Sequence, residues 1–337
     1  MHKKKIKLYL VFVFCLFVFV LYFTLKDNFK DIVSTLAGVN IVYLFIAIMI
    51  VFISKLLIGI IIYYLSKKEY KEIDIKKIFK IELIYPFFAG ITPGSIGGES
   101  SEIIYLKQSG VPYGKASSTV IQKYIIYQIA LIVVNFVVVI LNLFTNIIPS
   151  NGLVNTAVIL NFLFNSLLLG TLYLLTYNKK FNHFIMNKGL YFLYKIRIVK
   201  DLEKTKNKLD SYLNNFEDGA TKLKSDKKLF VKLILMCMMS LVFLIGAIIP
   251  VGWSLNISGI NVLNLFILGA FVKMISLLIV TPGNSGASEY AFIYLFTGLL
   301  ASEDIMAYML IWRVVTYYIP LTVGGILAMT WRGDDNE

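Results

Sequence analysis

The residues best suited to do chemistry lie in a phrase that the sequence uses twice. Residues 92–106 read TPGSIGGESSEIIYL and residues 281–295 read TPGNSGASEYAFIYL, with seven identities at an offset of 189. Each phrase places a Pro-Gly pair and a nearby carboxylate between long apolar stretches. Helices interrupted at matching positions of two half-molecules are typical of the central site of a membrane transporter. The repeat therefore predicts a transport or binding site built from two broken helices.

The chemistry of such a site is expected to centre on anion binding. A helix that begins inside a bilayer has backbone N–H groups that water does not reach. We expect Ser95 and, in the second phrase, Asn284 or Ser285 to act as N-caps. The remaining positive helix end favours phosphate, and glycine lets a bulky headgroup approach the backbone. The glycines of the two phrases, with their prolines, are Pro93, Gly94, Gly97, Gly98, Pro282, Gly283 and Gly286.

Two cations occupy matching positions further along each half. Residues 121–127 (IQKYIIY) align with residues 311–317 (IWRVVTY), which places Lys123 opposite Arg313. Arginine offers phosphate a bidentate fork, and lysine offers it a point charge. Both residues are therefore candidates to hold an anionic headgroup.

Three carboxylates accompany the broken helices, namely Glu99, Glu102 and Glu289. An ionisable group at mid-membrane costs about 2.5–3.5 kcal/mol on insertion scales, so it usually faces a cavity and pairs. Glu99 and Glu102 are three residues apart and share one helix face. They could pair with the two cations as structural locks, bind an amine of a substrate, or exchange a proton; the sequence leaves these roles open.

Two further lysines lie inside apolar runs. Lys273 is expected to snorkel towards the membrane surface or to pair with a carboxylate. Lys55, near the middle of a predicted span, fits either packing or function.

Composition sets the class of protein. The 337 residues are 58% hydrophobic, and the mean hydropathy is +0.75. Several apolar runs are long enough to cross a bilayer core of roughly 30 Å. The net charge of +13 does not indicate nucleic-acid binding. The Lys and Arg residues lie between apolar runs, as they do in cytoplasmic loops beside anionic lipid. We predict an all-α polytopic membrane protein in the cell (plasma) membrane.

Charge counts give the predicted topology. Six spans are expected at about residues 8–25, 41–65, 118–145, 157–177, 229–250 and 305–330, with both termini cytoplasmic. The loop 178–232 holds 14 basic and 6 acidic residues, net +8, and is predicted to be cytoplasmic. Leu202, Leu209, Leu213 and Phe216 recur within it at helical spacing, which suits an amphipathic surface helix.

Residues 81–108 and 262–300 do not fit as single spans. We predict two re-entrant helical hairpins that turn near their Pro-Gly pairs. Three spans separate them, and an odd number inverts orientation, so their tips should meet from opposite faces near the midplane. The chain is thus predicted to be one transmembrane domain, 1–337, with repeat 1 at about 81–145 and repeat 2 at about 262–330.

Signatures of enzymes and cofactors are absent from the sequence. The stretch GVPYGKAS at 110–117 does not fit GxxxxGK[ST], and the two histidines, His2 and His183, form no HExxH or triad pattern. Cys15 and Cys237 fall in apolar runs without CxxC spacing. We therefore expect no catalytic residues, no cofactor and no metal.

The ordered pair of motifs, PGxxGGE and PGxxGxxE followed by a span with Arg, resembles the lysylphosphatidylglycerol synthase transmembrane-domain family, also called flippase-like. The resemblance covers about residues 5–330 and implies lipid translocation or lipid-headgroup binding. The aminoacyl-transferase domain that follows the membrane part in bifunctional relatives is not matched, so synthase activity is not implied. The family often has a Glu-Arg pair and a downstream Asp in the span after the first hairpin, where this chain has Gln122-Lys123 and Tyr127. This departure leaves the substrate open between headgroups and lipid-linked sugars.

The sequence therefore predicts a translocase of an anionic phospholipid, an aminoacylated phospholipid or a polyprenyl-phosphate-linked headgroup. The alternatives are an ion-coupled transporter of small solutes and a non-transporting subunit that presents lipid to a separate transferase. The expected partners are membrane lipids, and either a second copy of the chain or a lipid-synthesising enzyme.

Overall fold

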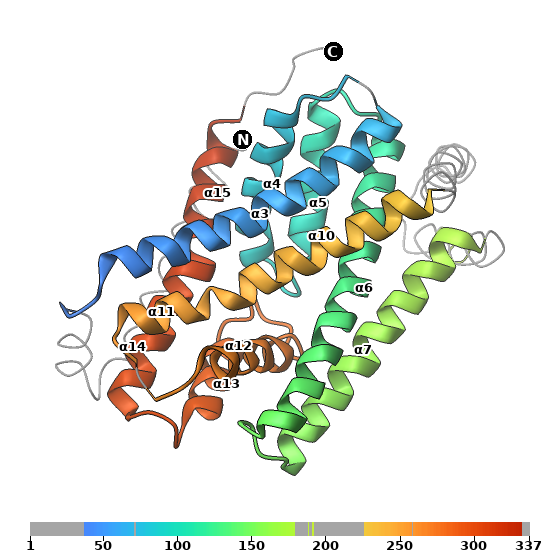
Figure 1. The fold of residues 1–337 in the computed structure, drawn as a ribbon. Coiled ribbons are helices and arrows are strands. Elements are labelled where there is room, and N and C mark those ends of the chain that lie inside the picture. The colour runs from blue at the N-terminus through green and yellow to red at the C-terminus, as the bar shows by residue number, and fades with distance from the viewer. Residues whose placement is uncertain are drawn as a thin grey trace.

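A computed structural model gives the fold (Figure 1). It describes residues 37–70, 72–178, 226–257 and 259–331, and the single positions 188 and 191. The described residues form helices and no β-strand, which confirms the predicted all-α class. The first predicted span, the amphipathic segment at 202–216, most of the basic loop and the tail after residue 331 lie outside the described residues.

The helices follow the predicted order. Their bounds are α3 Ile41–Glu69, α4 Ile75–Gly90, α5 Ile96–Gln108, α6 Tyr113–Thr145, α7 Gly152–Tyr177, α10 Lys227–Gly246, α11 Ile248–Ser254, α12 Val262–Ser276, α13 Ala287–Phe296, α14 Ser302–Arg313, the π-helical turn η1 Val314–Tyr318, and α15 Ile319–Met329.

Five helical stretches of the described chain are long and apolar enough to cross a membrane, so the protein is a multi-pass membrane protein. They are Ile41–Lys68, Tyr113–Thr145, Gly152–Leu174, Lys227–Ser254 and Ser302–Met329. These stretches confirm the five predicted spans that fall within the described residues. Two of them are less regular than predicted. The fourth is divided at Ala247 into α10 and α11, and the fifth contains the π-helical turn.

Helices α3 and α10 form an antiparallel pair at the centre of the bundle (Figure 1). At one end, Asn40 N–H donates to the carbonyl of Ser254 at 2.7 Å. At the other end, Lys68 lies 3.7 Å from Asp226. Between the ends, the buried hydroxyls of Ser54 and Ser240 lie 3.0 Å apart and hydrogen bond. These contacts fix the register of the two spans without placing a charge in the middle of the pair.

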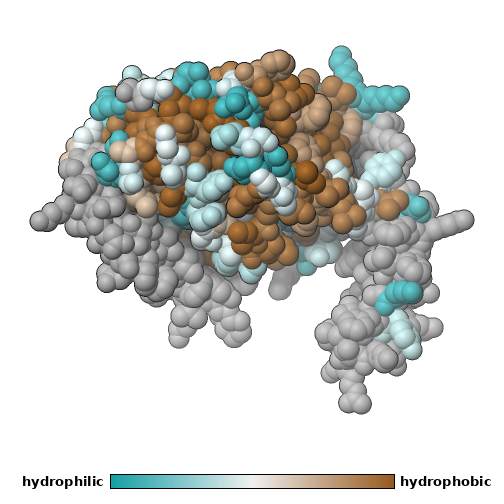
Figure 2. Space-filling view, turned by 90° about the horizontal axis from the view of Figure 1, so that it is seen from below, coloured by the Kyte–Doolittle hydropathy of each residue, from teal (hydrophilic) through white to brown (hydrophobic). Residues whose placement is uncertain are grey.

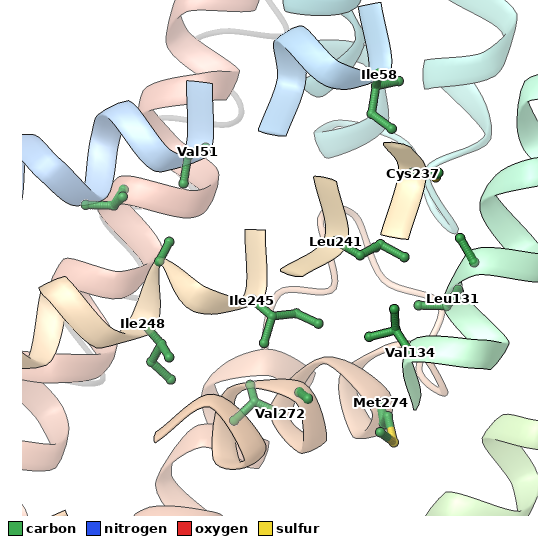
Figure 3. Packing of buried hydrophobic residues seen from close by; sticks show 14 of the residues in the cluster. Val51, Ile58, Leu131, Val134, Cys237, Leu241, Ile245, Ile248, Val272 and Met274 are labelled. Carbon is green, nitrogen blue, oxygen red and sulfur yellow. The ribbon is translucent and has the colours of Figure 1, made fainter. Parts of the chain in front are cut away.

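The core lies where α3, α10 and α11 meet α6 and α12. Figure 3 shows Val51 and Ile58 of α3, Leu241 of α10, Val134 of α6 and Val272 of α12 around this region. Each of these five side chains is buried. Aliphatic side chains therefore join the two halves of the protein by close packing.

Large apolar side chains are also exposed, as expected of a surface that meets lipid. Phe45 of α3, Leu167 of α7 and Leu235 of α10 each expose more than half of their surface. Only 17% of the residues in the apolar window of α7 are buried, so α7 lies mainly at the periphery. Figure 2 shows apolar residues over much of one face of the molecule, with polar residues gathered in patches among them.

The two predicted hairpins are present as pairs of short helices. Helices α4 and α5 are joined by a break at residues 91–95, and α12 and α13 by a break at residues 277–286. At about 1.5 Å per residue, helices of 10–16 residues are too short to cross the bilayer core. The predicted breaks at Pro93-Gly94 and Pro282-Gly283 are thus confirmed.

The hairpins open towards opposite ends of the bundle. Tyr105 of α5 contacts Trp331, which follows α15, whereas Tyr294 of α13 accepts a hydrogen bond from Asn151 at the start of α7. The backbones of Pro93 and Pro282 lie against each other in an isolated antiparallel bridge. The hairpin tips therefore meet, as the sequence predicts; their depth in the bilayer stays a prediction.

Gly324 tests the packing of α15 on the first hairpin. A Cβ there would lie 2.7 Å from the carbonyl of Leu83 and 3.1 Å from Phe87. We expect Gly324→Ala to destabilise the protein by about 1–3 kcal/mol, because overpacking forces the backbones apart. The measurement is thermal unfolding in detergent. Gly170→Ala is the matched control, since a Cβ at Gly170 meets nothing within 4 Å; equal melting temperatures for the two variants would contradict this packing.

Candidate functional site

The two breaks have the same backbone conformation. Gly94 and Ser95 have φ of 63° and 60°, and their counterparts Gly283 and Asn284 have φ of 59° and 53°. In each break the N–H of the fourth residue of the phrase donates to the carbonyl of the first, at 3.2 Å in the first break and 3.1 Å in the second. Left-handed backbone is easy for Gly and tolerated by Asn. The repeated phrase therefore encodes a repeated turn.

The capping groups differ from those predicted. Ser95 occupies the N-cap position of α5, but its side chain makes no capping hydrogen bond. Thr92 caps instead, because its Oγ1 accepts the N–H of Gly97 at 2.9 Å. At α13 the N-cap is Gly286, and its N–H donates to Glu289 Oε2 at 2.7 Å. Asn284 and Ser285 are therefore not the caps. The side chains of Thr92 and Glu289 reach the free N–H groups from positions that flank the left-handed residues of each turn.

Most glycines of the two phrases make room for protein atoms, which corrects the expectation that they admit a headgroup. A Cβ on Gly97 would lie 2.7 Å from the carbonyl of Phe88, and one on Gly98 would lie 2.5 Å from the ring of Tyr85. A Cβ on Gly283 would lie 2.3 Å from the ring of Tyr317, and one on Gly94 would lie 3.2 Å from Val280. Only Gly286 of this set has open space within 4 Å.

Arg313 holds the second break together. Its Nε lies 2.8 Å from Oε1 of Glu289, and both side chains are almost fully buried. Its Nη2 donates to Oγ of Ser285 at 3.1 Å, and the guanidinium stacks 4.3 Å from the centre of the Tyr317 ring. The charge of Arg313 is thus balanced by Glu289, which is also the cap of α13.

Tyr317 links this break to the first hairpin. It lies in η1, and its hydroxyl donates to the carbonyl of Gly90, the last residue of α4, at 3.1 Å. The π-helical turn follows Arg313 directly, and such turns are frequent at functional sites. Tyr317 was not among the predicted site residues. The signal that could have identified it is its position in the repeat, where it matches Tyr127.

The first hairpin carries its own polar cluster. Lys123 of α6 donates to both carboxylate oxygens of Glu102, at 2.8 Å and 2.6 Å, and lies 4.7 Å from the centre of the Tyr85 ring. Tyr85 in turn donates to Glu99 Oε1 at 2.7 Å. The two halves therefore share a plan in which a cation on a long helix pairs with a carboxylate on the helix after the break.

Glu82 of α4 completes this cluster and was not singled out from the sequence. It lies 3.6 Å from Lys55 of α3, which was left open between packing and function. A carboxylate in the otherwise apolar run before the first break is the signal that identifies it.

A cavity of about 160 Å³ lies at the second break. Its polar lining comes from Lys273 and Ser276 of α12, Asn284 of the turn, Ser288 of α13 and Arg313. Leu244 and Ile245 of α10 form part of the apolar wall. No residue of the first hairpin lines it, so this cavity belongs to the second half of the protein; a site between the two tips stays a prediction.

Lys273 is the distinctive residue of this cavity. The sequence predicted that it snorkels or pairs with a carboxylate, but among the described residues its ammonium has no ion pair and no hydrogen bond. The side-chain amide of Asn284 is also without a hydrogen-bond partner within the described chain. Both groups can donate hydrogen bonds, so the cavity offers unused donors and a net positive charge.

The predicted site residues thus divide into groups. Gly283, Asn284 and Arg313 line the cavity, and Glu289 pairs with Arg313 beneath it. Glu102 and Lys123 form the buried pair of the first hairpin, with Glu99 beside them through Tyr85. Pro93 and Pro282 form the contact between the tips.

The helix ends contribute less positive potential than expected. Glu99 lies in the first turn of α5, and Glu289 lies in the first turn of α13. A carboxylate there offsets the positive end of the helix dipole. The positive charge of the cavity therefore rests mainly on Lys273.

A second, larger hollow of about 660 Å³ lies where the α3–α4 and α5–α6 connections meet. It combines Glu72 and Asp74 with Lys77 and Lys107. This mixture of signs gives it no net positive charge, so the smaller cavity is the better anion site.

Comparison with known proteins identifies the family of the chain. Residues 7–324 match the family described as the lysylphosphatidylglycerol synthase TM region. The chain belongs to this family. A UPF0104 membrane protein of Archaeoglobus fulgidus is 28% identical to it over 257 residues, which cover 73% of this chain and 74% of the relative.

Two contacts show how this member of the lysylphosphatidylglycerol synthase TM-region family accommodates Gln122 and Lys123 in the span after the first hairpin. Gln122 is buried and donates to Ser118 Oγ at 2.7 Å within α6. Lys123 finds its carboxylate on α5 rather than on its own helix. The charge at this level of the bundle is therefore balanced between helices.

Arg313→Met tests the ion pair at the second break. We expect it to destabilise the protein by about 3–5 kcal/mol, because it leaves the buried carboxylate of Glu289 unpaired. Adding Glu289→Gln should restore part of this loss, since the unpaired charge is removed. The measurement is thermal unfolding of both variants in detergent, and a double variant less stable than Arg313→Met would contradict the pairing.

Proposed function

We propose that this membrane protein binds an anionic lipid headgroup in the cavity at the second break and moves it across the bilayer. The observation that carries the proposal is the ammonium of Lys273, which lines a polar cavity and has no ion pair among the described residues. An uncompensated charge inside a bundle is costly, and a phosphate group would supply the opposite charge. The side-chain amide of Asn284, which has no hydrogen-bond partner in the described part of the chain, adds a directional donor for the phosphate oxygens.

The surroundings of the cavity favour a lipid over a small solute. Ile279 and Val280, immediately before the second Thr-Pro-Gly, expose 50% and 64% of their surface. The lining itself combines Leu277 and Trp312 with the polar groups. A headgroup in the cavity would thus have apolar surface beside it for acyl chains, whereas a solute carrier needs a site closed off from lipid.

Charge distribution supports an orientation in the cell membrane. Lysines gather where α3 ends and where α4, α6 and α10 begin, including Lys68, Lys80 and Lys227. Glu303 and Asp304 lie at the start of α14, at the opposite end of the bundle. By the positive-inside rule the lysine-rich end is cytoplasmic. The first hairpin then opens to the cytoplasm and the second to the outside, with both termini cytoplasmic.

Lys273→Met tests the headgroup site. We expect about a tenfold or greater loss of phosphatidylglycerol translocation, since loss of a charged hydrogen bond costs about 1.5–3 kcal/mol. The measurement is dithionite quenching of fluorescent phosphatidylglycerol in proteoliposomes of phosphatidylcholine. Lys80→Met is the matched control, because Lys80 is exposed outside the cavity.

The same assay separates the alternatives. Equal rates for wild type and Lys273→Met would refute the site. Binding of phosphatidylglycerol without translocation by the wild type would favour the subunit that presents lipid to a separate enzyme. Transport of soluble anions, but not of lipid, would favour the solute carrier.

Cysteine labelling tests the orientation. In a variant without Cys15 and Cys237, we expect Glu303→Cys to react with an impermeant maleimide on intact cells. Lys80→Cys should react only after permeabilisation, because the lysine-rich end faces the cytoplasm. The reverse pattern would invert the proposed topology.

A further inference from the structure

The polar cluster of the first hairpin holds more negative than positive charge. Glu82 of α4 and Glu99 and Glu102 of α5 face Lys55 of α3 and Lys123 of α6. Three carboxylates against two ammonium groups leave one excess negative charge if all five are ionised. Glu82 and Glu102 are 2% and 0% exposed, so water does not compensate for this charge.

One carboxylate oxygen of the cluster has no donor. Lys123 donates to both oxygens of Glu102, and Lys55 lies 3.6 Å from Oε1 of Glu82. Within the described residues, Oε2 of Glu82 is buried and accepts no hydrogen bond. The Tyr85 ring joins the two ion pairs, since its centre lies 5.4 Å from Nζ of Lys55 and 4.7 Å from Nζ of Lys123, so Glu82 and Glu102 belong to one buried cluster. Two buried carboxylates in one cluster repel each other when both are ionised, and one proton on the pair removes that repulsion.

We propose that Glu82 and Glu102 form a binding site for one proton, and that this proton is the ion coupled to headgroup movement. With one proton the cluster is neutral. Without it, a net negative charge is buried at the first break. The coupling half of this proposal rests on the proposed lipid translocation, whereas the proton site stands on the cluster alone.

The surroundings of the pair favour a proton over a metal cation. A hard cation such as Na⁺ or Ca²⁺ requires several oxygen ligands. Here two ammonium groups already occupy positions beside the carboxylates and would repel a metal. Among the described residues, the other titratable groups near the pair are Tyr85 of α4, Tyr127 of α6 and Cys237 of α10. Helix α15, which packs on α4, has no charged side chain between Ile319 and Met329.

The position of the pair connects a proton to movement of the hairpin. The Lys123–Glu102 bond joins α6 to α5, and the Tyr85–Glu99 bond joins α4 to α5. On the other side, Tyr317 holds the end of α4 at Gly90. A proton on Glu102 would weaken the hold of Lys123 on α5, and its return to Glu82 or to water would restore that hold. The first hairpin is thereby free to move only while the proton lies on Glu102.

Infrared difference spectroscopy tests the proton site on the full chain in detergent. We expect wild type at neutral pH to show the carbonyl band of a buried protonated carboxyl group. Glu82→Gln and Glu102→Gln should each lose this band, and Glu303→Gln, which removes an exposed carboxylate, should retain it. A band that is absent from wild type, or that survives in both variants, would overturn the site.

Transport under a pH gradient tests the coupling. We expect a gradient to change the rate of phosphatidylglycerol translocation by wild type and by Glu303→Gln, and to have no effect on Glu82→Gln. A rate in wild type that ignores the pH gradient, or that follows a sodium gradient instead, would overturn the coupling and leave the lipid site intact. Loss of translocation in Lys273→Met with an unchanged infrared band would show that the two sites act separately.

Discussion

The structure depends on one constraint: a helix that breaks within an apolar bundle must satisfy its own polar ends. At the membrane depth predicted for the two breaks, water is not available to hydrogen bond free N–H and C=O groups. Both breaks meet this need with side chains that reach over a tight turn, Thr92 at the first and Glu289 at the second. The carboxylate of Glu289 then requires a cation, which Arg313 supplies from the neighbouring span.

This constraint is met by different charge arrangements in the two repeats. In the second half the cation and the carboxylate neutralise each other, and Lys273 remains as the charge that faces the cavity. In the first half Glu102 neutralises Lys123, and a second ion pair, between Lys55 of α3 and Glu82 of α4, belongs to the same cluster. One break thus presents a positive cavity, while the other encloses an acidic cluster. The tips meet through Pro93 and Pro282, so a change at either break can reach the other.

Tyr317 shows how closely the halves are connected. Its ring fills the space that Gly283 leaves and stacks on Arg313, and its hydroxyl holds the end of α4. The π-helical turn places this side chain one position further round the helix than a regular α-helix would. Movement of the first hairpin relative to η1 would therefore disturb the environment of Arg313, which lines the cavity.

The sequence by itself determined the class of protein, the five described spans and the two breaks. It also determined which motifs of the two halves correspond to each other. These follow from the length of the hydrophobic runs and from the helix-breaking Thr-Pro-Gly phrase, which recurs at an offset of 189. Only the tertiary structure decided the partners: Glu102 for Lys123, Thr92 rather than Ser95 as the cap, and, among the described residues, no carboxylate for Lys273. The reason is physical, because side chains on different helices meet according to helix rotation and crossing, which local patterns do not fix. The same reason explains why the apolar run around Glu82 marked it as unusual but did not show that it joins the cluster of Glu102 and Lys123.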